Sequence, residues 1–337
     1  NIEFILRFWW LYKNNHPQAI LPEKVSGSDL YRIQQQLGKH YFYEDKLIHL
    51  SSQQDNNIHP QTSIILFTSG SSGGTKAVQL SKDNILANTN AVSKTLDLHL
   101  VKNQILFLPL HYSFGLLGQL VPAIELNICT YLFNHLLESK NIIPSHLDCL
   151  ISGVPQHYQT LRKLFPNDKF ANITHVVSAG AYWSSQDRMD TQKLFPNAVL
   201  YNNYGQTELS PRALNISSKD PAFFKGVTGR VVPGLTSKIN DEGELLFKGK
   251  QVMLGYINDD NISQERSDRW WFTGDHAKEE DGIITVLGRK DDILKINGER
   301  TSLFFINNRI KEIAMVIEAI TLNEIEVQQD ISLLTFI

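Results

Sequence analysis

The chain has 337 residues, which exceeds one ordinary domain, so two or more modules are expected. Its 32 Lys and Arg are nearly balanced by 35 Asp and Glu, and a formal net charge of −3 gives no basic footprint for nucleic acid and no polybasic membrane anchor. Two cysteines, Cys129 and Cys149, are too few for a disulfide scaffold and fit no metal-ligand spacing, which favours the reducing cytoplasm.

The predicted elements begin with an apolar stretch at residues 2–12, which is far shorter than a membrane span and does not have the form of a signal peptide. From residue 64 onward, strand-like apolar runs alternate with amphipathic stretches such as residues 184–194. The strand-like runs are residues 64–67, 77–80, 105–110, 129–133, 149–154, 175–179 and 198–201. This alternation predicts an α/β fold of parallel sheets with crossover helices. After about Gly226 the short strands are punctuated by glycine, which predicts a smaller barrel-like subdomain.

The most informative segment follows the first of these strands and reads Thr68-Ser69-Gly70-Ser71-Ser72-Gly73-Gly74-Thr75-Lys76. Glycines allow backbone N–H groups to turn toward an anion, hydroxyls add donors without bulk, and Lys76 supplies a point charge. The segment therefore predicts a loop that holds a polyphosphate, at a strand end where open α/β sheets bind ligands.

Two other interpretations of this loop fail. A Walker A loop ends in Gly-Lys-Ser/Thr, whereas this one ends in Gly74-Thr75-Lys76-Ala77. A flexible Ser/Gly linker predicts polar flanks, but both flanks are apolar strands. The loop is therefore predicted to bind a nucleotide.

Further motifs follow in order along the chain. They are Tyr201-Asn202-Asn203-Tyr204-Gly205-Gln206-Thr207-Glu208, residues 243–249 and 253–256, Phe272-Thr273-Gly274-Asp275, and the segment from Gly288 to Gly298 that contains Arg289, Asp291 and Lys295. Taken singly, Thr-Glu is typical of a helix N-terminus, Thr-Gly-Asp of a turn, and Lys290-Asp291-Asp292 of a solvated charge run. In this order and spacing, residues 64–298 resemble the adenylate-forming superfamily of acyl- and aryl-CoA synthetases, peptide-synthetase adenylation domains and luciferases.

The resemblance implies roles for the nucleotide-binding residues. Thr68, Ser69, Gly70, Ser71, Ser72 and Gly73 would surround the phosphates of ATP together with the catalytic Lys76. Tyr204 would stack on adenine, and such stacking contributes roughly 1–3 kcal/mol in nucleic-acid sites. Asp275 and Arg289 would bind the ribose. Thr207 would donate to the α-phosphate, and Glu208 would be the carboxylate ligand of a phosphate-bound Mg²⁺.

The acid would bind next to these groups. His111 or Tyr112 is expected to face it, in a segment that resembles Pro-x-x-His-x-x-Gly of the family, and Gly180, Asn203 and Gly205 are expected to line the same pocket. Residues 106–120 contain no Asp or Glu that could hold an α-ammonium group, which disfavours an α-amino acid.

The reaction that the resemblance implies is attack of a carboxylate on the α-phosphate of ATP, with release of pyrophosphate and formation of an acyl-adenylate. Coenzyme A or the phosphopantetheine of an acyl carrier protein would then take the acyl group, after a rotation at the hinge residue Asp291 that brings Lys295 toward the thiol. An acyl-CoA synthetase is the preferred interpretation, and transfer to a carrier protein is the alternative.

Both ends depart from the family pattern, and we predict an abbreviated large domain at residues 1–288, followed by a hinge and an incomplete small α+β domain at residues 289–337. Thr75 replaces the usual proline of the phosphate loop. The family's C-terminal lysine in a Gly-Lys context is not found, since Lys311 follows no glycine. These departures leave a third hypothesis, a non-catalytic adenylate-binding protein.

Overall fold

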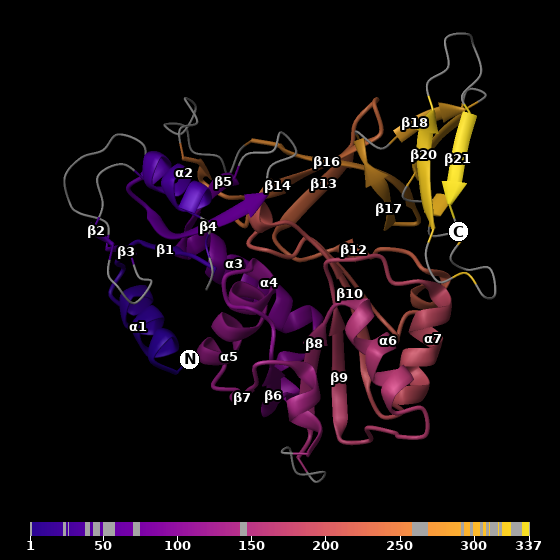
Figure 1. Ribbon diagram of the computed structural model, residues 1–337, viewed down its shortest axis with the longest axis horizontal. Helices are drawn as coiled ribbons and strands as arrows, with labels where there is room; N and C mark the ends of the chain where they lie inside the picture. Colours follow the sequence, from indigo (N-terminus) through magenta and orange to yellow (C-terminus); the bar gives the residue numbers. More distant parts are fainter. Residues whose placement is uncertain are drawn as a thin grey trace.

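The computed structural model describes residues 2–22, 25, 27–37, 41–42, 48–49, 58–69, 75–141, 147–257, 269–290, 293–296, 299–303, 306–307, 310, 316, 319–324 and 332–336. Two larger sheets enclose a layer of helices, and a smaller curled sheet lies over one end of them (Figure 1). Within these ranges no helix has the length and apolar content that a membrane span requires.

The seven-stranded sheet confirms the predicted parallel arrangement. Its order is β12-β11-β10-β9-β8-β6-β7, in which β7, β6, β8, β9 and β10 run parallel and β11 and β12 are antiparallel additions. The strands are β6 (Asn103–Leu106), β7 (Cys129–Leu132), β8 (Cys149–Gly153), β9 (Ile173–Ser178), β10 (Val199–Tyr204), β11 (Leu214–Ser217) and β12 (Arg230–Val231). All five residues of β8 are buried, as expected for a central strand covered on both faces.

The six-stranded sheet is mixed rather than parallel. Its order is β15-β5-β4-β1-β3-β2, and only β1 and β4 run parallel. The strands are β1 (Gln18–Ile20), β2 (Tyr41–Phe42), β3 (Ile48–His49), β4 (Thr62–Ser69), β5 (Thr75–Ser81) and β15 (Gly255–Tyr256). Because β4 and β5 are antiparallel, the predicted phosphate loop connects a β-hairpin and does not lead from a strand into a helix.

Helices cover both faces of the seven-stranded sheet. In Figure 1, α3 to α5 lie between the two larger sheets, whereas α6 and α7 lie on the other side of the seven-stranded sheet. The α-helices are α1 (Ile2–Lys13), α2 (Gly27–Leu37), α3 (Lys82–Thr95), α4 (Ser113–Gly115), α5 (Val121–Glu125), α6 (Pro155–Leu164) and α7 (Ser185–Leu194). Short 3₁₀ turns are η1 (Leu98–Leu100), η3 (Leu136–Asn141), η4 (Thr207–Leu209) and η5 (Pro221–Lys225), and η2 (Leu116–Leu120) is a π-helical turn that joins α4 to α5.

Local sequence explains where these helices begin and end. The side chain of Ser81 caps α3 by accepting from the backbone N–H of Asn84, whose side chain accepts in turn from the N–H of Ser81. At the start of α7 the Ser184 hydroxyl accepts from the backbone N–H of Asp187 and donates to the carboxylate of the same residue. Pro166 and Pro196 each stand two residues after the last helical leucine, where proline cannot continue a helix.

The smaller sheet has the order β13-β14-β16-β17 and is antiparallel throughout. It corresponds to the smaller barrel-like subdomain of short strands that the sequence predicts after Gly226. Its strands are β13 (Leu235–Ile239), β14 (Glu244–Gly249), β16 (Trp271–Glu280) and β17 (Ile283–Arg289), and two hairpins follow, β18 (Ile293–Ile296) with β19 (Glu299–Ser302) and β20 (Ile320–Glu324) with β21 (Ser332–Phe336). Its core includes Leu209, Ala213 and Leu214, so the segment after β10 is anchored to this sheet. Residues at the carboxyl end of β10, in the seven-stranded sheet, therefore lie next to the small sheet.

Candidate functional site

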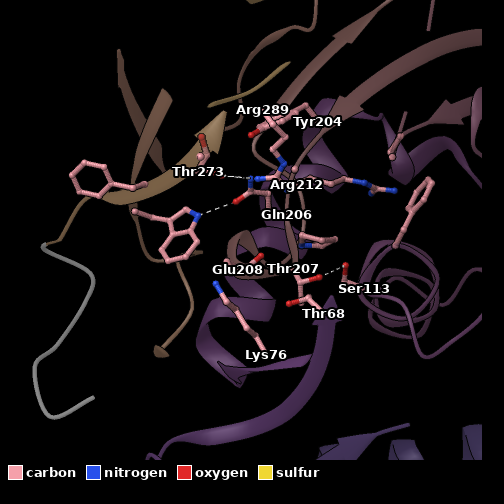
Figure 2. A pocket seen from close by; sticks show the side chains of 18 of the residues that line it. Thr68, Lys76, Ser113, Tyr204, Gln206, Thr207, Glu208, Arg212, Thr273 and Arg289 are labelled. Atoms are coloured by element: carbon pink, nitrogen blue, oxygen red, sulfur yellow. Dashed lines mark hydrogen bonds between the residues drawn. The ribbon is translucent and has the colours of Figure 1, made fainter. Parts of the chain in front are cut away.

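A cavity of about 820 Å³ lies between the carboxyl ends of β9 and β10, the β4–β5 hairpin and the small sheet. Figure 2 shows Thr68, Lys76, Thr207 and Glu208 on one side of it, Tyr204, Thr273 and Arg289 on the other, and Gln206 and Arg212 between them. The lining residues are Thr68, Lys76, Ser113, Phe114, Ala179, Gly180, Tyr204, Gly205, Gln206, Thr207, Glu208, Pro211, Arg212, Glu244, Tyr256, Trp271, Phe272, Thr273, Gly274, Arg289 and Lys290. The fold therefore brings together residues of the phosphate-loop segment and of all five motifs that follow it in the chain.

The hairpin supplies Thr68 and Lys76, which are register partners on β4 and β5. The ammonium of Lys76 lies 5.0 Å from the centre of the Tyr256 ring, on the neighbouring strand β15. Of Ser69 only the backbone is described, and Gly70, Ser71, Ser72 and Gly73 lie outside the described residues. The two described ends of the loop thus frame one wall of the cavity.

Thr207 and Glu208 open the 3₁₀ turn η4, so the helix N-terminus typical of Thr-Glu is reduced here to a single turn beside the cavity. The hydroxyls of Thr207 and Ser113 are 3.0 Å apart, and the Tyr256 hydroxyl donates to Glu208 Oε1 at 2.7 Å. Glu208 is the acidic residue next to the phosphate-loop ends, which fits a Mg²⁺ ion held by one carboxylate plus substrate phosphates and water. Among the described residues no group of three or more His, Cys, Asp or Glu could enclose a metal.

Tyr204 and Arg289 line the other end of the cavity, and both contact Asp275, Tyr204 through a hydrogen bond and Arg289 through an ion pair. The Tyr204 hydroxyl donates to Asp275 Oδ2 at 2.5 Å, and Arg289 Nε lies 3.3 Å from Asp275 Oδ1. Asp275 and Arg289 are register partners on β16 and β17, which explains their proximity despite thirteen intervening residues in the chain. Burial raises the pKa of Asp275, while the hydrogen bond from Tyr204 and the charge of Arg289 oppose that shift.

The Thr-Gly-Asp motif lies inside β16 and not in a turn, contrary to what the motif alone suggests. The pairing of β14 with β16 is irregular here, since Glu244 faces His276 whereas Leu246 faces Phe272. The bulge places Gly274 at φ +72°, in the left-handed region that favours glycine, and its N–H donates to Glu244 Oε1 at 3.0 Å.

Gln206 and Trp271 are two site residues that the motif comparison missed. Gln206 Nε2 donates to Asp275 Oδ2 at 3.0 Å and to the Thr273 carbonyl at 2.8 Å, and its Oε1 accepts from Trp271 Nε1 at 3.0 Å. Gln206 occupies the variable position of the Tyr-Gly-x-Thr-Glu motif, so the motif carries no signal for it. These hydrogen bonds connect Gln206, just after β10, to strand β16 of the small sheet.

A second cavity of about 300 Å³ adjoins the first and shares Gly180, Tyr204, Gly205, Gln206 and Arg289 with it. Asn203 and Asp275 also line this cavity. Asn203 is 4% exposed, its Oδ1 accepts from Asn215, and its Nδ2 has no hydrogen-bond partner among the described residues. An amide donor without a partner in a cavity wall is suited to a polar ligand edge.

His111 and Tyr112, which the sequence predicts to face the acid, do not line either of these two cavities. Tyr112 is 60% exposed, and the rings of His111 and Tyr112 lie 4.1 Å apart. The next two residues, Ser113 and Phe114, line the large cavity. The role of His111 and Tyr112 stays a prediction, and burial lowers the pKa of His111.

Arg212 also lines the large cavity, and the motif comparison missed it. Its neighbours in the sequence include the buried apolar residues Leu209, Ala213 and Leu214. The predicted hinge residue Asp291 lies outside the described residues, and of Lys295 only the backbone in β18 is described. Gly298 and Lys311 also lie outside them.

Comparison with known proteins agrees with this geometry. A family model described as AMP-binding enzyme matches residues 14–257. D-alanine–D-alanyl carrier protein ligase of Staphylococcus aureus strain bovine RF122 / ET3-1 is 26% identical over 300 residues, which cover 82% of this chain and 59% of that protein. The chain therefore spans less than two thirds of the length of this relative.

Two structures of o-succinylbenzoate CoA synthetase from Bacillus subtilis share the fold. The complex with the acyl-adenylate intermediate has a TM-score of 0.77 at 19% identity, and the complex with ATP and magnesium ion has 0.75 at 18%; each comparison covers 94% of this chain and 72% of that one. Since the family model matches most of the sequence and the fold agrees, the chain belongs to the family of AMP-binding enzymes, within the adenylate-forming superfamily.

Proposed function

We propose that this protein activates a carboxylic acid with ATP, forming an acyl-adenylate and releasing pyrophosphate. The observation that carries this proposal is the large cavity in which Lys76, Thr207 and Glu208 face Tyr204 and Arg289, both of which contact Asp275 in the wall of the adjoining cavity. The first group has the cation, hydroxyl and carboxylate that a metal-bound polyphosphate needs, and the second has the aromatic ring and hydrogen-bonding groups that suit a nucleoside. The spacing of the two groups around one cavity suits a nucleotide that spans it.

The proposed chemistry needs no protein nucleophile. An oxygen of the substrate carboxylate attacks the α-phosphorus, the bond from that phosphorus to the bridging oxygen breaks, and pyrophosphate leaves with the electron pair. Lys76 and Thr207 stabilise the negative charge on the phosphate oxygens, and Tyr204, Asp275 and Arg289 fix the nucleoside. Mg²⁺ held by Glu208 would supply further charge neutralisation.

The thiol acceptor in the second half-reaction has two candidates. A carrier-protein pantetheine is supported by the relative named as a D-alanyl carrier protein ligase, and coenzyme A by the fold shared with o-succinylbenzoate CoA synthetase. We propose coenzyme A as the first to test, with Lys295 and a rotation at Asp291 between residues 1–288 and 289–337 as the conformational step.

The test of the proposed function is carboxylate-dependent exchange of radioactive pyrophosphate into ATP, across a panel of short, medium, long-chain and aryl acids. The assay should be run on this chain and on a chain extended at its C-terminus. Exchange that requires an acid supports adenylation. ATP binding without exchange in either chain would favour the non-catalytic adenylate-binding hypothesis, which Thr75 in place of the usual proline keeps open.

The acceptor is tested by offering coenzyme A or a loaded carrier protein to the adenylate. We expect thioester formation with coenzyme A to release AMP at a rate above hydrolysis. If AMP is released with the carrier protein but not with coenzyme A, the acceptor is the carrier protein.

Nucleotide affinity should depend on pH through Asp275. The ionised carboxylate accepts hydrogen bonds from ribose hydroxyls, and burial raises its pKa above the usual range of aspartate. As pH falls through this raised pKa, the carboxylate takes up a proton, so we expect the affinity for ATP to decline at a higher pH than for an ordinary aspartate. Calorimetric titration of the wild type against Asp275→Asn tests this, and an identical pH dependence in both proteins would refute it.

A further inference from the structure

The side chain of Arg212 lies in the wall of the large cavity, and none of the described residues forms an ion pair with it. The residue is 3% exposed, and its Nε and Nη1 have no hydrogen-bond partner within the part of the chain that the structure describes. A buried guanidinium is costly unless it is paired, and burial alone lowers the pKa of Arg212 to about 9. The free protein thus holds a cation that the described residues do not neutralise.

The other charged groups of the cavity are already engaged. Arg289 pairs with Asp275, Lys290 pairs with Glu242 and Glu244, and Glu208 accepts from Tyr256. Lys76 lies over the ring of Tyr256 at the phosphate end. Among the described charged residues that line the cavity, Arg212 is therefore the one without an ion pair and without a proposed role toward the nucleotide or the metal.

The surroundings of Arg212 hold its side chain in the wall of the large cavity. Its Cζ lies 5.4 Å from the centre of the Phe114 ring, and Phe114 also lines the cavity. A methyl group on Gly118 would lie 3.2 Å from Arg212 Nη2, so the π-helical turn η2 makes room for the guanidinium by means of a glycine. The side chain of Asn88 on α3 donates to the Arg212 carbonyl at 2.7 Å and fixes the backbone.

We propose that Arg212 binds a second carboxylate of the acid, so that the substrate is a dicarboxylic acid whose other carboxylate is activated. This inference rests on the proposed function and adds the substrate class. A carboxylate against a buried guanidinium forms a charge-assisted pair, often with two parallel hydrogen bonds. The same cation repels the ammonium group of an amino acid, in agreement with the absence of Asp and Glu from residues 106–120.

The first experiment compares acids of equal length in the exchange assay, each unbranched dicarboxylate against its monocarboxylate and its monomethyl ester. We expect one dicarboxylate to be preferred. Arg212→Gln should lower its kcat/KM by about 10²-fold, mainly through KM, and leave the monocarboxylates within a few-fold. Arg212→Lys should recover part of the loss, and the exposed Arg230→Gln is the matched control.

Thermal unfolding separates this role from a structural one. Removing a buried cation without a partner should keep or raise the Tm of the ligand-free protein in Arg212→Gln, whereas a structural arginine would lower it. A lowered Tm, equal use of mono- and dicarboxylates by the wild type, or an equal loss for all acids in Arg212→Gln would each overturn the proposal.

Failure of the proposed function gives a different result. If no acid supports exchange, calorimetric titration with the same paired acids, in the presence of a non-hydrolysable ATP analogue, still decides the inference. Tighter binding of a dicarboxylate that is lost in Arg212→Gln supports it, and binding that does not distinguish the paired acids overturns it.

Discussion

Replacing Glu208 by glutamine is expected to lower the rate of acid-dependent ATP–pyrophosphate exchange by about 10²–10³-fold, the loss typical of one well-placed electrostatic contact. The amide keeps the shape of the side chain and can still accept from Tyr256, which bonds Oε1 at 2.7 Å in the native protein. It removes the negative charge that a metal ion requires. The change should therefore appear in the Mg²⁺ dependence of the exchange rate, with an unchanged Tm.

Two controls bracket this result. Glu279→Gln makes the same chemical change on an exposed position of β16 away from the cavity and should leave the rate unaltered. Tyr256→Phe removes the hydroxyl that positions Glu208 and should cost within about tenfold. If Glu208→Gln keeps the native rate and the native Mg²⁺ requirement, Glu208 is not the metal ligand.

The convergence of the nucleotide motifs could be predicted from the sequence because each lies next to a strand with a clear pattern. The runs before Ala179 and Gly205 are apolar strands, and their observed parallel pairing as β9 and β10 brings both carboxyl ends to one edge. The strand before Thr68 and the one after Lys76 were also correctly predicted. Their antiparallel pairing was not, because pairing direction is a property of contacts between strands and not of either strand's own pattern.

The parts that sequence patterns missed depend on irregular geometry. The bulge at Gly274 turns a motif typical of a turn into part of a strand, through an irregular register that only the partner strand β14 defines. Arg212 stands outside every motif, and its interest comes from burial without a partner. The sequence does show Arg212 as the one charged residue between Leu209 and Leu214, and this is the signal that could have found it.

The substitution Gly205→Ala is expected to disrupt the site more than the addition of a Cβ at any other of the described glycines. The added Cβ of Gly205→Ala would lie 1.8 Å from the carbonyl oxygen of Pro211 and 2.8 Å from Cα of Arg212, so the backbone itself would have to move. Backbone atoms cannot rotate away as a side chain can, and overpacking of this kind costs about 1–3 kcal/mol of folding free energy or more. Asn88, which donates to the carbonyls of Leu209 and Arg212, holds the same segment from the other side.

The displaced segment carries Glu208 and Arg212, so Gly205→Ala should reduce both stability and activity. Thermal or urea unfolding measures the first loss, and exchange with the best acid at a temperature where the variant is folded measures the second. The matched control is Gly27→Ala, because a methyl group at Gly27 would meet nothing within 4 Å. We expect that control to unfold within about 0.5 kcal/mol of the wild type, as is usual for a substitution that meets no neighbour. A Gly205→Ala variant as stable as Gly27→Ala would mean that the close approach of the two segments does not restrain this site.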